Sequence, residues 1–267
     1  MNHIAIAVLV SLVATSTSAF SATVDVDYPK LRDSELGRVL IGCIWAAEAE
    51  GSTAPSEAAN GCTRILVSWD GPKAPPVVRY RGVPAQAVID RLAAKPEGAA
   101  IDSPIGPAWP ANQKGFLVAK VADDEVVMVT VKMMPTLVMP EWPEQRDRVI
   151  SFSGPASHLK LGDLQDNLSS FDFVWEPSGV LELLATANSK TDAKSVMRYI
   201  SLRRPLLDIA AGVGVEKAEF PAKLLSGASF TRSGAKITVK SSLNEDMRGE
   251  AVAFLVKTIN KQMRKYN

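Results

Sequence analysis

Hydrophobic and polar residues alternate along several short stretches of this 267-residue chain, and a period of two is typical of β-strands. The stretch 23–28 alternates Val with Asp, which predicts a strand with Asp25 and Asp27 on one face. The stretches 115–121 and 125–134 flank the polar residues "ADDE", so we expect a hairpin there. The other strands expected from the pattern span 63–69, 77–82, 149–154, 171–175, 179–187, 228–232 and 235–243.

A period near 3.6 residues predicts helices between these strands. Residues 33–49 carry an apolar stripe, and Asp33 or Ser34 can cap its first N–H groups. Pro205 is expected to interrupt a helix that begins at 192, because proline lacks the N–H group of the helical ladder. Further helices are expected at 84–94 and 160–170, and an amphipathic helix capped by Asn244 at the C-terminal end.

In chain order these elements give the same succession twice. Each half reads β-α-β-β-α-β-β, and its first six elements follow the β-α-β-β-α-β order of ferredoxin-like sandwiches, although no sequence motif is common to the two. We therefore expect an α+β protein of two similar halves, each an antiparallel sheet covered by helices. The expected N-terminal domain spans 20–134 and the C-terminal domain 149–267, with a proline-marked linker at 135–148.

The N-terminus has the pattern of an export signal. Residues 4–14 are mostly apolar, and at ~1.5 Å per residue they are too few to cross an apolar layer ~30 Å thick. Thr17 and Ala19 are the small residues that a signal peptidase needs, although "MNH" carries no Lys or Arg. We expect 1–19 to be a signal peptide and the mature chain to be periplasmic or extracellular. The alternative is an N-terminal core element.

The composition and charge of the chain limit the kinds of partner that it is expected to bind. The chain is 46% hydrophobic and 22% charged, as globular proteins are, so it can bury a core. Thirty basic and 29 acidic residues leave a net charge of +1, which lacks the basic excess that nucleic-acid binding requires. No segment after the leader is long and apolar enough to predict a membrane span. A protein or a cell-envelope polymer remains the expected partner.

The two cysteines, Cys43 and Cys62, are interpreted through the expected compartment. An exported chain favours a disulfide between them. A zinc site is disfavoured because His158 is the one histidine after the leader, and a redox motif would place its cysteines two residues apart. The motif "LIGC" resembles a lipoprotein box but lacks a preceding apolar run. Two unpaired buried thiols remain the alternative.

Residues for catalysis are scarce. His158 lies near Ser153 and Ser157, but no G-x-S-x-G elbow is present. The acidic residues of "ADDE" fall in a predicted turn, and no calcium-loop spacing occurs. The glycine pair in "GVGVEK" follows a helix and lacks the third glycine of a dinucleotide loop. We expect no cofactor and no metal.

Two tryptophans are the candidate binding residues. Trp109 and Trp142 lie in the proline-rich segments "GPAWPAN" and "MPEWPEQ", and stiff amphipathic rings of this kind favour recognition surfaces. The alternative is that they fill a seam between the two halves. The sequence therefore favours an exported non-catalytic binding or structural module over an enzyme. The competing hypothesis is an exported hydrolase whose Asp, Glu or Ser residues converge only in the fold.

Overall fold

The computed structural model of the chain describes residues 21–34, 37–38, 41, 61–70, 75–82, 84–112, 114–144, 147–156, 166–212, 222–244, 247 and 249–251. Within these residues the strands are β1 (Ser21–Asp27), β2 (Arg64–Asp70), β3 (Val77–Arg81), β4 (Ala108–Pro110), β5 (Phe116–Ala122), β6 (Glu125–Thr130), β7 (Ile150–Pro155), β8 (Leu168–Trp175), β9 (Val180–Ala187), β10 (Ser229–Ser233) and β11 (Lys236–Ser242). The helices are α2 (Tyr28–Asp33), α5 (Ala85–Leu92), the 3₁₀ helix η1 (Met134–Thr136) and α6 (Lys190–Gly212).

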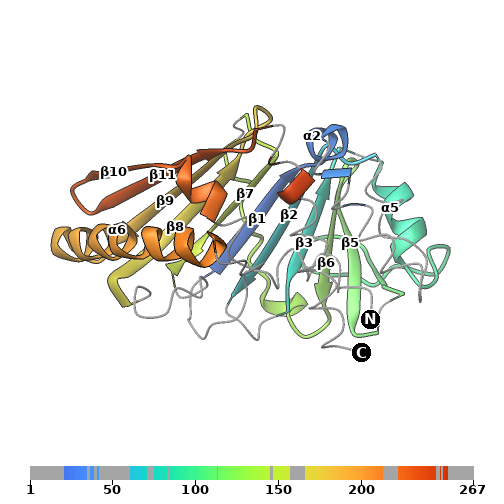
Figure 1. Ribbon diagram of the computed structural model, residues 1–267. Coiled ribbons are helices and arrows are strands. Elements are labelled where there is room, and N and C mark those ends of the chain that lie inside the picture. The colour runs from blue at the N-terminus through green and yellow to red at the C-terminus, as the bar shows by residue number, and fades with distance from the viewer. Residues whose placement is uncertain are drawn as a thin grey trace.

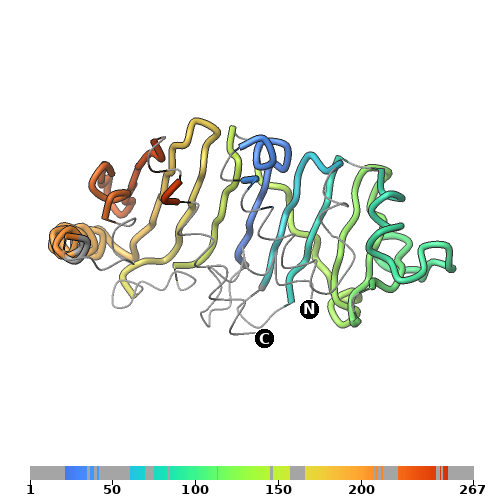
Figure 2. The backbone as a smooth tube through the Cα atoms, turned by 45° about the vertical axis from the view of Figure 1, so that its right-hand side comes forward, coloured from blue at the N-terminus to red at the C-terminus, as the bar shows by residue number. Residues whose placement is uncertain are grey.

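All of these strands belong to one antiparallel sheet. Its order is β10-β11-β9-β8-β7-β1-β2-β3-β6-β5-β4, so β1 lies in the interior and pairs with β2 on one side and β7 on the other. Figure 1 shows β1 between these two neighbours, and Figure 2 shows the strands side by side along the sheet. Backbone hydrogen bonds thus connect the N-terminal and C-terminal parts of the chain without a break.

The predicted fold class is therefore wrong. A ferredoxin-like unit separates the two strands that flank its first helix by another strand, whereas β1 and β2 are direct antiparallel neighbours. Each part instead begins with a three-stranded meander, β1-β2-β3 or β7-β8-β9, which is followed by a helix and a hairpin. The second strand of the hairpin pairs with the third strand of the meander, β6 with β3 and β11 with β9. This common path explains why the sequence shows one succession twice. The boundaries 20–134, 135–148 and 149–267 remain a prediction.

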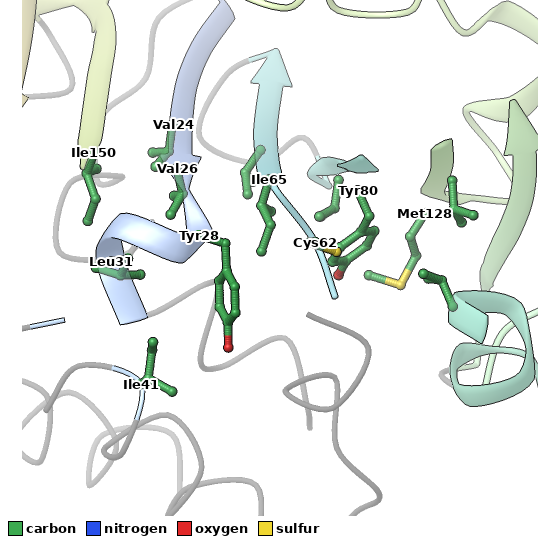
Figure 3. Close-up of a cluster of buried hydrophobic side chains, with 14 of the residues drawn as sticks. Val24, Val26, Tyr28, Leu31, Ile41, Cys62, Ile65, Tyr80, Met128 and Ile150 are labelled. Atoms are coloured by element: carbon green, nitrogen blue, oxygen red, sulfur yellow. The ribbon is translucent and has the colours of Figure 1, made fainter. Parts of the chain in front are cut away.

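The helices α2, α5 and α6 cover one face of the sheet, which we call the helix face. The apolar side of α5, including Val88 and Ile89, joins the main core with residues of β1, β2, β3 and β6. Figure 3 shows part of this cluster, with Tyr28 and Leu31 of α2 and Cys62 among its members. At the other end of the sheet, α6 packs on β9 and β11. None of the described helices is long and apolar enough to cross a membrane.

The opposite face is crossed by residues 133–144, the segment after β6, which we call the strap. Its first part packs with Met134 on a small apolar cluster that includes Val77, Leu117 and Val127. Its second part, 139–144, lies over charged side chains of β2 and β3. We call this side of the sheet the strap face. It holds the candidate site.

Several local predictions are corrected or confirmed by the structure. Strand β4 was not predicted, and α6 continues past Pro205 rather than ending there. Ser201, whose carbonyl loses its helical N–H partner at Pro205, is exposed, so water can satisfy that group. The cap at Asn244 is confirmed, because its Oδ1 accepts from the N–H of Met247 at 2.9 Å. The expected helix at 33–49 lies largely outside the described residues. The expected helix at 160–170 is wrong at its C-terminal end, because β8 begins at Leu168, and residues 160–165 lie outside the described part of the chain.

Candidate functional site

Charged residues on the strap face are aligned by strand register. Asp27 of β1 is opposite Arg64 of β2, Arg64 is opposite Arg81 of β3, and Arg81 is opposite Glu125 of β6. Directly opposite residues in an antiparallel sheet project from the same face with closely spaced side chains. One lateral row of the sheet therefore carries an acid, two arginines and another acid. Asp25, two residues before Asp27, projects from the same face, as the alternation predicted.

The carboxylate of Asp25 is held by two arginines. Arg64 donates from Nε to Oδ1 and from Nη2 to Oδ2, both at 2.7 Å, and Arg148 Nη2 donates to Oδ2 at 2.5 Å. The side chains of Asp25 and Arg148 are 4% and 8% exposed. The same guanidinium groups hold the strap, because Arg64 donates to the carbonyl of Pro143 at 2.6 Å and Arg148 to that of Glu144 at 2.9 Å.

The carboxylate of Glu125 is held in the same way. Arg79 Nε donates to Oε1 at 2.8 Å, its Nη2 also contacts Oε1, and Arg81 donates to Oε2 from Nε at 3.1 Å and Nη2 at 2.7 Å. Arg79 also donates from Nη1 to the carbonyl of Pro140 in the strap. Each buried carboxylate thus accepts hydrogen bonds from two guanidinium groups.

The ring of Trp142 covers this cluster. The guanidinium carbons of Arg64, Arg79 and Arg81 lie 5.2, 4.8 and 4.5 Å from its centroid, within the range of cation–π attraction. Its Nε1 also lies 3.4 Å from both carboxylate oxygens of Glu125. The indole therefore stabilises the arginines with its face and approaches the carboxylate with its edge.

The cluster has an excess of positive charge. Four guanidinium groups share the two carboxylates Asp25 and Glu125, which leaves these six groups with a net charge of +2. Buried charge without a counter-charge is costly unless dipoles, rings or solvent offset it. Trp142, the strap carbonyls and the partial exposure of Arg81, 39% for its side chain, provide that offset. A bound anion would offset more of the excess positive charge.

Described residues of the strap face line two cavities. One of about 250 Å³ is lined by charged and polar groups: Asp25, Asp27, Pro29, Thr63, Arg64, Arg81 and Arg148. The other, about 400 Å³, lies under the first part of the strap, and its lining is mostly apolar apart from Thr23, Ser68, Thr136 and Glu141. The hydroxyl of Ser68 is buried there without a hydrogen-bond partner among the described residues.

The ionisation of Glu125 follows from its surroundings. Burial by itself raises the pKa of this carboxyl, but the hydrogen bonds and charges of Arg79 and Arg81 outweigh burial, so the net pKa lies below its ordinary value of 4.5. A carboxyl with a lowered pKa stays ionised at neutral pH. It is poorly suited to give or take a proton there.

The lowered pKa of Glu125 predicts how the free energy of unfolding depends on pH. The contribution of Glu125 to stability is complete above its unfolded pKa, near 4.5, and is lost as the pH falls through the lower folded pKa. We expect the free energy of unfolding to fall with acidification below about pH 4.5 more steeply in the wild type than in Glu125→Gln. Urea unfolding over a pH series checks this, and parallel pH curves for the two proteins would contradict it.

The structure places the two candidate tryptophans on opposite faces. Trp109, in β4, is half-buried, packs against the main core on the helix face and donates from Nε1 to the carbonyl of Gly98 at 3.1 Å. Trp142 lies on the strap face over β2 and β3. They do not form one surface, and neither lies at the β1–β7 junction between the two parts. Their role in binding stays a prediction.

The predicted disulfide between Cys43 and Cys62 is not tested by the structure. Cys43 lies outside the described residues, and Cys62 is buried in the main core. Burial raises the pKa of the Cys62 thiol to about 12, so a thiol at this position would be protonated and unreactive in the folded protein.

We expect the disulfide to be present in protein from its native compartment. Alkylation in denaturant without reductant should then add no mass, and alkylation after reduction should add two groups, because a bond hides both sulfurs until it is reduced. A bridge of this loop length would add roughly 3 kcal/mol to the free energy of unfolding. Two groups added without reductant would contradict the prediction.

The other candidates form no second site within the described part of the chain. His158 and most of the "GVGVEK" segment lie outside the described residues. Among the residues that are described, no three His, Cys, Asp or Glu side chains gather in a way that could hold a metal ion. The arginines of the strap face were missed by sequence reasoning. The available signal was the alternation of Arg79 and Arg81 in an otherwise apolar strand.

Fold and site together define a class: an α+β protein on one antiparallel sheet, with helices on one face and a strapped arginine–carboxylate cluster on the other. The fold resembles that of TP0453. Its crystal form I aligns with a TM-score of 0.50 at 10% identity, over 91% of this chain and 96% of that chain, and crystal form IV aligns with a TM-score of 0.49 at 9% identity, over 91% and 95%. At this identity the likeness concerns the fold alone. No protein-family model and no curated protein sequence matches the chain.

Proposed function

We propose that this protein is an exported, non-catalytic module that binds its ligand, a protein or a cell-envelope polymer, through the strap face. The observation that carries the proposal is the arginine–carboxylate cluster. Its two carboxylates are each held by two guanidinium groups, it has excess positive charge, and two open cavities lie beside it. Such a fixed array of donors is suited to recognition.

The ionisation of the cluster favours binding over hydrolysis. General acid–base catalysis is most efficient when the pKa of the group lies near the working pH, whereas the pKa of Glu125 is lowered and its oxygens already accept from Arg79 and Arg81. Asp25 is likewise engaged by Arg64 and Arg148. A carboxylate so engaged would have to lose strong hydrogen bonds before it could attack or take a proton. This supports the non-catalytic reading and gives no cofactor a role.

The leader sequence supports the exported location. Residues 4–14 and the small residues Thr17 and Ala19 form the pattern of a cleavable signal. The near balance of charge over the whole chain makes nucleic acid an unsuitable partner. Sequencing the N-terminus of the mature protein tests export, with Phe20 as the expected first residue and a retained Met1 as the contrary result.

Position-specific photocrosslinking in the producing cells tests the binding face. Val138, in the strap, is 86% exposed and lines the larger cavity, so a benzoylphenylalanine placed there should form a discrete adduct with the ligand. Leu202 on α6 is 64% exposed and serves as the matched control. The proposal requires an adduct from position 138 and none from position 202. Adducts from 202 alone, or from neither position, would refute it.

A further inference from the structure

We propose that the 250 Å³ cavity between β1, β2 and β3 binds an oxyanion group of the ligand, a carboxylate or a phosphate. The inference rests on the proposed function and names the chemistry that the strap face recognises. It is carried by three arginines, Arg64, Arg81 and Arg148, that line one cavity.

The arginines keep donors for a ligand. Both hydrogen bonds of Arg148 come from Nη2, to Asp25 and to the carbonyl of Glu144, while its Nε and Nη1 have no acceptor among the described residues. Arg64 and Arg81 each use Nε and Nη2, which leaves Nη1 of both without an acceptor in the described part of the chain. N–H groups of guanidinium bind carboxylate and phosphate oxygens strongly and often in pairs.

The cavity is also organised before any ligand arrives. Asp25 fixes Arg64 and Arg148, and Glu125 fixes Arg81, so the guanidinium groups need little reordering to receive an anion. Preorganised donors bind more tightly because less side-chain entropy is lost on binding. Thr63, also in the lining, has its hydroxyl directed to the carbonyl of Arg81.

The charge of the lining matches an anion. Lys30, whose Nζ lies 3.1 Å from Oδ2 of Asp27, also pairs with Asp147 at 2.8 Å, so the charges of Lys30 and Asp147 cancel. The lining itself carries three guanidinium groups and the two carboxylates Asp25 and Asp27. One positive charge is therefore left for the ligand. The larger cavity differs, since its described lining residues include Glu141 and no basic side chain. The oxyanion group therefore belongs in the smaller cavity.

Isothermal titration of the mature protein with acetate and with inorganic phosphate, at neutral pH and low ionic strength, tests this inference. Sodium chloride is the salt control. Binding of acetate alone identifies a carboxylate ligand, binding of phosphate alone a phosphate ligand, and binding of both supports the shared chemistry. Binding of neither overturns the inference.

Three variants connect the binding to the cavity. Arg81→Gln, at a partly exposed side chain, should weaken the affinity about tenfold by removing one charged donor. Asp27→Asn should strengthen it several-fold by removing a repelling carboxylate, while Asn still caps α2. Arg232→Gln, on exposed β10, should leave the affinity unchanged.

The Asp27→Asn result keeps the test decisive even if Arg81→Gln does not fold, because a purely structural cluster predicts no gain in affinity. An equal loss in Arg232→Gln, or no gain in Asp27→Asn, overturns the inference. Adducts at position 138 without anion binding would refute the oxyanion and leave the binding face in place. Anion binding without adducts at position 138 would support the oxyanion site and refute the proposed binding face.

Discussion

Replacing Glu125 with leucine is expected to lower the free energy of unfolding by about 3–5 kcal/mol, the cost of removing one partner from a buried ion pair. The substitution leaves Arg79, 9% exposed, and Arg81 without their carboxylate, and it also removes the acceptor beside Trp142. Urea unfolding at neutral pH measures the loss. It should exceed the effect of Glu125→Gln, which keeps one acceptor oxygen.

Asp123→Asn is the matched control for this variant. Asp123 lies in the β5–β6 turn, two residues before Glu125, but its side chain is 98% exposed, and its ion pair with Lys120 is open to solvent. We expect no measurable change there. Adding Arg79→Met to Glu125→Leu should recover part of the loss, because it removes an unpaired buried charge. A loss below about 1 kcal/mol in Glu125→Leu would mean that the cluster is not buried as described.

Replacing Val24 with aspartate should abolish the folded state of the whole chain. Val24 is 3% exposed in the main core, and an unpaired carboxylate there costs more than about 4 kcal/mol, a large share of the stability of a typical protein. Because β1 pairs with both β2 and β7, the loss should reach both parts of the sheet together. Circular dichroism and hydrogen exchange of strands β3 and β8 measure it.

Val131→Asp is the control for the core substitution, since Val131 is 50% exposed just after β6. It should keep the wild-type melting temperature. Exchange protection that survives in β8 while β3 is lost, or the reverse, would contradict the joint unfolding. That result would support separate domains at 20–134 and 149–267 instead.

Local pattern predicted most of the strands. The alternation in β1 and the hairpin of β5 and β6 are confirmed, because side-chain period and turn residues are local properties. Strand order was not predictable in the same way. The pairing of Thr23 with Ser153 joins residues far apart in the chain, and the sequence of neither strand specifies which strand it pairs with. Element order alone therefore suggested two sheets where there is one.

The predictions at short or proline-containing elements were wrong for a different reason. Strand β4 is three residues long, ends at Pro110 and is surrounded by residues typical of loops. It is therefore too short to show a detectable alternation, although it pairs with β5. Pro205 was given its usual meaning as a helix breaker, yet an exposed turn of α6 tolerates it. In both cases tertiary context outweighs the local signal.

The candidate site was predictable only in part. Asp25 and Asp27 were correctly placed on one face of a strand, but nothing in the sequence indicated that Arg64 and Arg148 would lie beside Asp25. Arg64 lies in β2 and Arg148 lies two residues before β7, and only the register of the sheet brings them together. Trp142 was selected for its proline-rich surroundings, whereas its contact with three arginines depends on the path of the strap.

The most direct measurement is fluorine NMR of protein labelled with 5-fluorotryptophan, titrated with the anion that binds in calorimetry. The central claim is that ligand chemistry resides on the strap face, where Trp142 covers the arginines, and not on the helix face, where Trp109 packs. The account predicts a saturable shift of the Trp142 resonance and an unmoved Trp109 resonance. A shift of Trp109 with Trp142 unchanged would contradict it.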